Sequence, residues 1–168
     1  ATLALAFAPA CGARQTAEAS YTEAAELAFM NAERAFDRKD YELARQRYGE
    51  VSQQYPYSMY AALAEFRTGD AYLREKSFAR AIDTFRRFVR MRPTHERVAE
   101  AQYKIALAYV QQMPRDLFIR PPSYERDLTD AENAHRALES FVAGYADSPF
   151  ADDARDHLAR TTERLSAY

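Results

Sequence analysis

The sequence predicts an all-α protein, built as a right-handed solenoid of helix pairs. Three observations support this prediction. Apolar residues recur at steps of three and four through most of the 168 residues, which is the spacing of one helix face. Only four residues are glycine and none is tryptophan, which argues against a turn-rich β architecture. Two similar helical stretches end in prolines, Pro56 and Pro93, which lie 37 residues apart.

The predicted helices follow one another in pairs. The stretch 78–91 shows the pattern best, because its apolar residues make one helical stripe and its arginines lie off that stripe, on an expected solvent-facing side. Pro93 ends this helix, since proline disfavours helical geometry in the residue before it. The first two predicted pairs are residues 20–37 with 41–55 and 58–75 with 78–91, and 95–112 begins the third. We expect 113–130, which contains three prolines, to be a loop inserted in the third repeat, before a helix that starts at about 131 and a last helix over 149–166.

The helix pairs repeat residue by residue. Four positions of the second helix recur after 37 residues, as Tyr41 and Phe78, Ala44 and Ala81, Tyr48 and Phe85, and Val51 and Phe88. In the first helices a small residue recurs at the same step, at Ala32, Gly69 and Ala106, where it would let two helices approach closely. This order resembles the tetratricopeptide pattern, whose usual period is about 34 residues. About three extra residues per repeat would explain the longer period, and about three and a half repeats are expected.

Composition and motifs exclude several classes of function. A formal net charge of −2 gives no bulk attraction to nucleic acid, so no nucleic-acid partner is expected. The single cysteine excludes an internal disulfide and a cysteine-based zinc site. The histidines form no metal-binding pair at helical spacing, and no nucleophile elbow, phosphate loop or zinc motif occurs. We therefore expect no enzyme activity, no catalytic residue, no metal site and no cofactor.

The first residues predict an export signal. The stretch ATLALAFAPAC is apolar, ends in small residues and is about half as long as a membrane span. Its last residue, Cys11, resembles the lipidated cysteine of a bacterial lipoprotein, although Ala8 stands where such signals usually have leucine. The alternative is an ordinary cleavage site followed by an incidental cysteine. We predict a signal remnant, a lipidated Cys11 and a linker over residues 1–19, and a repeat domain over residues 20–168.

From about residue 24 to residue 168 the chain resembles the BamD family. The resemblance is carried by YPYSMYAALAEFRTGDAYLREKSFARAIDTFRRFVRMRPTHERVAEAQYKIALAY, an inserted loop, and ERDLTDAENAHRALESFVAGYADSPFADDARDHLARTTERLSAY. Features typical of the family are the triplet Pro93-Thr94-His95, the pair Arg126-Asp127 before the returning helix, and Arg164-Leu165 near a closing aromatic. Family members continue for further helical repeats, which carry much of the contact with the barrel-forming subunit. Further repeats are therefore expected beyond Tyr168, and the alternative is that the last helix caps the solenoid.

The resemblance implies a function. BamD proteins are lipoproteins of the outer-membrane β-barrel assembly machinery, so a non-enzymatic scaffold is expected, lipid-anchored at the periplasmic face of the outer membrane. The implied partners are a BamA-like barrel subunit, other lipoproteins of the machinery, unfolded outer-membrane proteins, and the membrane itself through Cys11. A second hypothesis is a periplasmic repeat adaptor of a Tol–Pal-like envelope system. The Pro-Thr-His triplet and the loop in the third repeat favour the first hypothesis.

One candidate binding surface is a row of residues on the first helices. Aromatic residues recur three positions before each small residue, and other residues follow on the same helices, which gives the set Phe29, Phe36, Phe66, Leu73, Arg74 and Tyr103. The first helices line the concave surface of such repeats, so this row is hypothesised to form a groove for partners or peptides. The resemblance supplies a ligand, the aromatic-ended C-terminal segment of an unfolded outer-membrane barrel protein. The alternative is that these side chains are packed in the core between helices.

The other candidate surface is the inserted loop. Phe118, Ile119 and Tyr124 are apolar residues without a repeat partner. Long loops in compact domains are usually functional or disordered, so these residues are hypothesised to dock a partner. The alternative is that they fold back on the solenoid.

Overall fold

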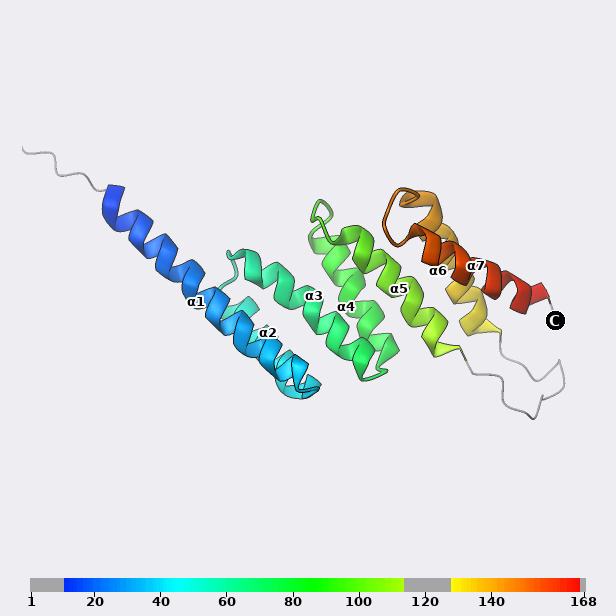
Figure 1. Ribbon diagram of the computed structural model, residues 1–168, viewed down its shortest axis with the longest axis horizontal. Helices are drawn as coiled ribbons and strands as arrows, with labels where there is room; N and C mark the ends of the chain where they lie inside the picture. The colour runs from blue at the N-terminus through cyan, green and yellow to red at the C-terminus, as the bar shows by residue number, and fades with distance from the viewer. Residues whose placement is uncertain (1–10, 114–127, 167–168) are drawn as a thin grey trace, which may run out of the picture. The chain divides into compact units, whose positions relative to one another are not determined.

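Figure 1 shows the computed structural model, which describes residues 11–113 and 128–166, with side chains from residue 18 onward. The described residues form seven α-helices and no strand, so the predicted all-α class is confirmed. The helices are α1 Cys11–Asp37, α2 Tyr41–Gln54, α3 Met59–Arg74, α4 Phe78–Met91, α5 Val98–Gln112, α6 Thr129–Gly144 and α7 Ala151–Ser166. The first helix begins at Cys11 instead of residue 20, which corrects the predicted boundary. The other helix ends lie within three residues of the predicted ones.

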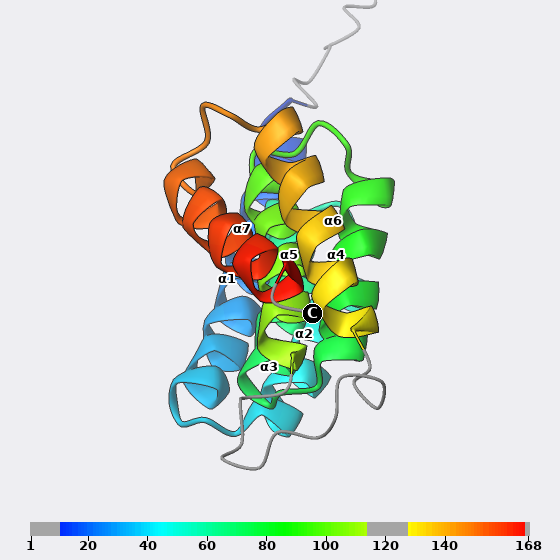
Figure 2. The same ribbon diagram turned by 90° about the vertical axis from the view of Figure 1, so that its right-hand side faces the viewer.

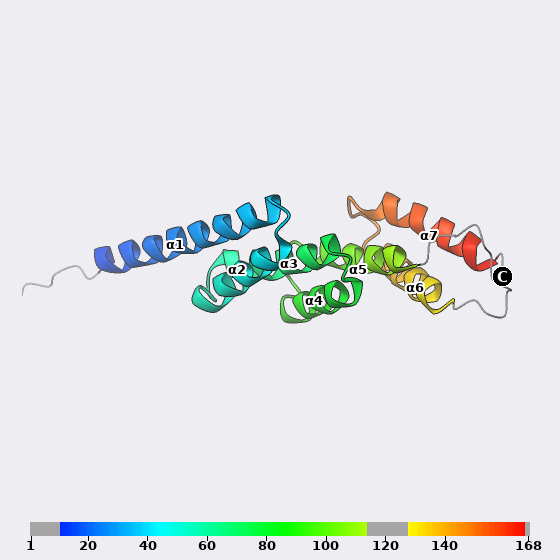
Figure 3. The same cartoon turned by 90° about the horizontal axis from the view of Figure 1, so that it is seen from below.

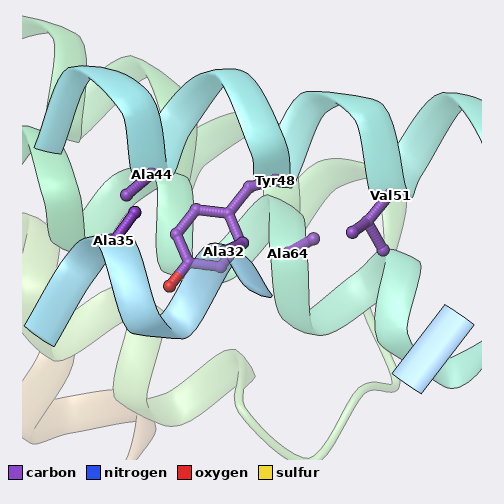
Figure 4. Packing of buried hydrophobic residues seen from close by; sticks show 6 residues of the cluster. All are labelled: Ala32, Ala35, Ala44, Tyr48, Val51 and Ala64. Atoms are coloured by element: carbon purple, nitrogen blue, oxygen red, sulfur yellow. The ribbon is translucent and has the colours of Figure 1, made fainter. Parts of the chain in front are cut away.

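The chain divides into two compact units, Ala1–Ala64 and Glu65–Tyr168, which we call unit 1 and unit 2. Unit 1 has its core between α1, α2 and the first turns of α3. Figure 4 shows six of its buried residues: Ala32, Ala35, Ala44, Tyr48, Val51 and Ala64. The alanines let the helices approach closely, and the larger side chains from α2 fill the space between them. The hydroxyl of Tyr48 donates to Glu33 at the edge of this core.

Unit 2 repeats the same arrangement with α5, α6 and α7. Helix α5 packs against both α4 and α6, and α6 packs against α7. Figures 2 and 3 show α6 and α7 as neighbours in two perpendicular views. The core between α5, α6 and α7 consists of Tyr103, Ala106, Leu138, Phe141 and Ala154. Small residues from the first helix again face large residues from the second, as expected for tetratricopeptide-like helix pairs.

The turns inside the helix pairs also repeat. Lys39 and Lys76, which are 37 residues apart, both adopt the left-handed backbone conformation, with φ of 64° and 60°. The next residue, Asp40 or Ser77, donates its N–H to a carbonyl in the last turn of the preceding helix, at 3.0 and 2.9 Å. This geometry ends a helix and usually contains glycine, because a side chain is disfavoured there.

The second helices of the pairs end in one common conformation. Their C-cap residues Tyr55, Arg92 and Tyr145 each donate the backbone N–H to a carbonyl of the last helical turn. Pro56 and Pro93 follow the first two caps, as predicted, whereas Ala146 follows the third. Proline therefore reinforces a turn that the chain also makes without it.

Candidate partner-binding surfaces

Phe66, the central residue of the hypothesised groove, lies inside unit 2. Its side chain belongs to α3 and is only 1% exposed. The ring makes edge contacts with Phe85 and Phe88 of α4, at centroid distances of 5.3 and 5.5 Å. At this position the structure therefore has the core packing that was the alternative to an open groove.

Gly69 allows the close contact between α3 and α4. A Cβ atom added at this position would lie 2.6 Å from two ring carbons of Phe85. The Phe85 side chain is fully buried and in contact with Phe66, so its ring has little room to move away. The small residue thus lets two helices approach closely, as the repeat pattern predicts.

Charged side chains join α3 to α5. They come from the two helices and from Arg97, the residue directly before α5. We call this set the ion-pair network: Arg67, Asp70, Arg97, Glu100 and Lys104. Lys104 of α5 bonds to Asp70 of α3 and lies 3.0 Å from Glu100, and Arg67 lies 3.1 Å from Asp70. The Asp70 side chain is only 9% exposed, so its carboxylate depends on these partners rather than on water.

The same network covers the ring of Phe66. The Nζ atom of Lys104 lies 4.6 Å from the ring centroid, and the guanidinium carbon of Arg97 lies 5.2 Å from it. A cation over an aromatic face is attracted by the charge distribution of the ring. The charged groups of Lys104 and Arg97 therefore lie between the ring of Phe66 and the solvent.

Tyr103, another member of the hypothesised row, joins α5 to α7. It is 9% exposed, and its ring stacks on Phe150 with centroids 5.0 Å apart. Its hydroxyl donates to the carboxylate of Asp153. Burial, followed by this hydrogen bond and the nearby negative charge, raises the pKa of Tyr103, so the hydroxyl remains a proton donor. Tyr103 therefore connects two helices.

The remaining residues of the row lie nearer to the surface. In unit 1, Phe29 is partly buried between Tyr48 and Tyr60, at centroid distances of 5.8 and 5.6 Å. Phe36 is also partly buried and makes an edge contact with Tyr41 at 5.3 Å. In unit 2, Leu73 is partly buried and Arg74 is exposed in the last turn of α3. Within each unit, the row therefore does not form a wall of open aromatic rings.

Unit 1 exposes apolar side chains that the repeat pattern does not single out. Leu27 and Met30, one turn apart on α1, are 57% and 46% exposed. Tyr57 and Met59, at the turn into α3, are 94% and 67% exposed. Met30, Tyr57 and Met59 have polar residues 37 positions later, at Arg67, Thr94 and Glu96, and this is the sequence signal that could have identified them. Leu27 gives no such signal, because the repeat aligns it with the buried Ala64 and Ala101. Neighbouring exposed apolar side chains are candidates for contact with another molecule.

Other kinds of site are less developed in the described part of the chain. A cavity of about 330 Å³ in unit 1 has a mostly polar lining, formed by Ala28, Asn31, Arg47, Glu50 and Gln54. Among residues 11–113 and 128–166, no cluster of ligating side chains could hold a metal ion. The helices in those ranges are all too short or too polar to cross a bilayer.

Two of the predicted sites lie outside the residues whose side chains the structure describes. Cys11 is the first residue of α1, and the description of side chains begins at residue 18. The loop residues Phe118, Ile119 and Tyr124 lie outside the described residues. Both sites stay predictions.

Comparison with known proteins gives a match over most of the chain. The model of a family described as "Outer membrane lipoprotein", YfiO, matches residues 22–168. The outer membrane protein assembly factor BamD of Vibrio cholerae is 26% identical over 121 residues, which are 70% of this chain and 50% of that protein. BamD of Caulobacter vibrioides is 27% identical over 141 residues, which are 84% of this chain and 44% of that protein. The chain thus spans about half the length of these curated relatives.

Proposed function

Because the chain belongs to the YfiO family of outer membrane lipoproteins, we propose that it is a lipid-anchored scaffold of the outer-membrane β-barrel assembly machinery. The family match over residues 22–168 carries the proposal. The names of the two BamD relatives support the assembly role. The architecture agrees with it, because arrays of helix pairs present extended surfaces that bind other proteins.

The proposed partners are a BamA-like barrel subunit, other lipoproteins of the machinery and unfolded outer-membrane proteins. In unit 1 the pairs Leu27 with Met30 and Tyr57 with Met59 are the side chains that such a contact would bury. Burial of large apolar side chains at the centre of an interface usually supplies most of the binding energy. We therefore place a protein contact on these two pairs.

Other proposed contacts come from the sequence hypotheses. Phe29 and Phe36 in unit 1, and Leu73 and Arg74 in unit 2, stay as separate candidate contacts for apolar segments of unfolded barrel proteins. The loop residues Phe118, Ile119 and Tyr124 stay as a candidate docking segment. Phe66 and Tyr103 act on binding only indirectly, by holding their helices in position.

Cys11 is the proposed point of attachment to the membrane. Several acyl chains would hold firmly, since each buried methylene contributes about 0.8 kcal/mol. Replacing Cys11 by Ala is expected to move the protein from the membrane pellet to the soluble fraction after a high-salt wash. If the Cys11→Ala protein still sediments with membranes in high salt, the proposed anchor is wrong.

The proposed scaffold role is tested by capturing the tagged full-length protein from crosslinked, detergent-solubilised membranes of its own organism. We expect the capture to recover a barrel-forming subunit of the assembly machinery. Leu27→Gln with Met30→Gln should lower that recovery, whereas Glu23→Gln, an exposed polar position on the same helix, should not. Recovery of Tol–Pal components without a barrel subunit would contradict the proposal and favour the adaptor hypothesis.

A further inference from the structure

The outer side of α4 carries a concentration of positive charge. Arg80, Arg86, Arg87 and Arg90 are all exposed there, and Asp83 is the only acidic residue of the helix. We call these four arginines the arginine face. With Asp83 included, helix α4 has an excess of three positive charges, in a chain whose formal net charge is −2. The opposite side of α4 is buried, so the helix separates apolar and cationic residues sharply.

The repeat does not require these arginines. The positions 37 residues earlier, on α2, are Leu43, Gly49, Glu50 and Gln53. The corresponding positions on α6, aligned through the buried Ala44 and Ala134, are Asn133, Glu139, Ser140 and Ala143. The second helices before and after α4 are therefore uncharged or acidic where α4 is basic. Among α2, α4 and α6, only α4 has arginines at these four positions. The repeat fold does not require them, so a role in binding is expected of them.

Contacts within unit 2 hold the two flanks of the face. The guanidinium of Arg80 lies 5.4 Å from the ring centroid of Tyr72. Arg86 donates to the hydroxyl of Tyr109 at 2.9 Å. Between these flanks, Arg87 and Arg90 make no hydrogen bond or ion pair with the described part of the chain. Their guanidinium donors are therefore available to an anion in the surroundings.

The chemistry of the face favours a phosphate-bearing surface. A guanidinium has a planar fork of donors that suits phosphate and carboxylate oxygens. Arginine also occurs in protein–protein interfaces, but there it accompanies the apolar and aromatic residues that form the centre of the interface. The arginine face has no apolar centre, and the one large exposed apolar side chain of α4 is Met91, at the end of the helix, with 70% exposure. A surface of closely spaced lipid phosphates suits such a face better than a folded protein does.

We propose that the arginine face of α4 docks on anionic phospholipid headgroups of the membrane that carries the protein. The inference rests on the proposed function, since it requires that the protein works at a membrane surface. Each arginine near an anionic bilayer strengthens binding, and the effect is confined to short range by salt. The face would be a second membrane contact beside the acyl anchor, and it would hold the α4 side of unit 2 toward the bilayer.

Vesicle sedimentation of the full chain with Cys11→Ala tests the inference, because no acyl chain can then hold the protein. The parent protein should bind vesicles of phosphatidylcholine mixed with phosphatidylglycerol, and should not bind phosphatidylcholine alone. Arg87→Gln with Arg90→Gln should lower the partition coefficient about 25-fold, since each arginine near an anionic surface accounts for about fivefold. High salt should abolish binding of the parent protein.

The matched control is Arg136→Gln with Arg160→Gln. Both residues are exposed and lie on α6 and α7. Replacing them removes two positive charges, as the double substitution on α4 does. This control should keep most of the binding, and all variants should keep the helical circular dichroism of the parent. An equal loss in both double variants, or a parent protein that does not bind anionic vesicles, would overturn the proposal.

A protein partner would give a different pattern of results. In that case the parent protein would not bind anionic vesicles. Capture from membranes would recover an acidic protein with the wild-type chain but not with the double variant Arg87→Gln and Arg90→Gln. This outcome overturns the lipid proposal and assigns the face to a protein. Because the vesicles contain no protein, the vesicle result and the capture of a barrel subunit can fail independently.

Discussion

Gly69 and Gly49 are both helical glycines, but their surroundings differ. A Cβ at Gly69 would collide with the buried ring of Phe85, whereas a Cβ at Gly49 would meet no atom within 4 Å. Gly69→Ala is expected to lower the free energy of unfolding by about 1 to 3 kcal/mol, because the core must shift. Gly49→Ala is expected to raise it by about 0.5 to 1 kcal/mol. Urea unfolding measures both, and a Gly69→Ala protein as stable as wild type would contradict the packing described here.

Phe66 and Tyr57 offer a similar comparison for aromatic side chains. Phe66 is 1% exposed and Tyr57 is 94% exposed. Phe66→Ala is expected to cost about 3 to 5 kcal/mol of stability, because it leaves a cavity between α3 and α4. Tyr57→Ala is expected to change stability by about 0.5 kcal/mol or less. If Phe66→Ala melts like wild type, the ring lies outside the core and the groove hypothesis regains this residue.

Tyr103 makes stability depend on pH in the alkaline range. Burial first, and then its bond to Asp153, raises the pKa of Tyr103 above the ordinary value of 10.0. Because the pKa is higher in the folded state, the stabilisation is complete below about pH 10 and is lost as the pH rises further. The stability difference between wild type and Tyr103→Phe is therefore expected to be about 1 kcal/mol near neutral pH and to shrink above pH 10. Urea unfolding across that range checks this, and a difference independent of pH would contradict it.

Between helices, the ion-pair network ties α3 to α5. Its central pair is poorly exposed, with 9% for the Asp70 side chain and 18% for Lys104. Lys104→Met leaves the Asp70 carboxylate with fewer partners, and we expect a loss of about 2 kcal/mol. In the double variant Asp70→Asn with Lys104→Met no such carboxylate remains, so its loss should be smaller than the sum of the single losses. A double-mutant cycle measures the coupling, and strictly additive losses would show that the pair is not coupled.

Most helices could be predicted because their apolar stripes are regular. The start of α1 was missed because residues 11–19 have no apolar stripe. The composition of the stretch CGARQTAEA, with alanine, glutamate, glutamine and arginine, nevertheless favours a helix. The left-handed turns at Lys39 and Lys76 were also missed, since lysine is not the residue that usually marks such a turn.

The candidate groove could be predicted only in part. Periodicity places Phe66 and Tyr103 on the first helices, but it does not tell which neighbour covers them. The ring of Phe66 is covered from α4 by other rings and from the α5 side by Lys104 and Arg97. These contacts join residues up to 38 positions apart, so a pattern within one helix does not contain them.

For the whole molecule, the sequence and the comparisons lead to the same family. The resemblance to the BamD family from about residue 24 onward agrees with the family match over residues 22–168. The chain spans about half the length of its curated relatives. The proposed partner contacts are therefore placed on surfaces of this chain and are not transferred from those relatives. These surfaces are the exposed apolar pairs of unit 1 and the arginine face of unit 2.

Depletion of the protein in its own organism tests the central claim most directly. Folded and unfolded outer-membrane barrel proteins are separated on gels without boiling, and other outer-membrane lipoproteins are quantified in the same samples. If the protein is a scaffold for barrel assembly, the folded barrels should decline and unfolded forms should accumulate, while the other lipoproteins keep their levels. Restoring the full-length chain should reverse the effect. Folded barrels that persist at normal levels through depletion and several cell divisions would contradict the account.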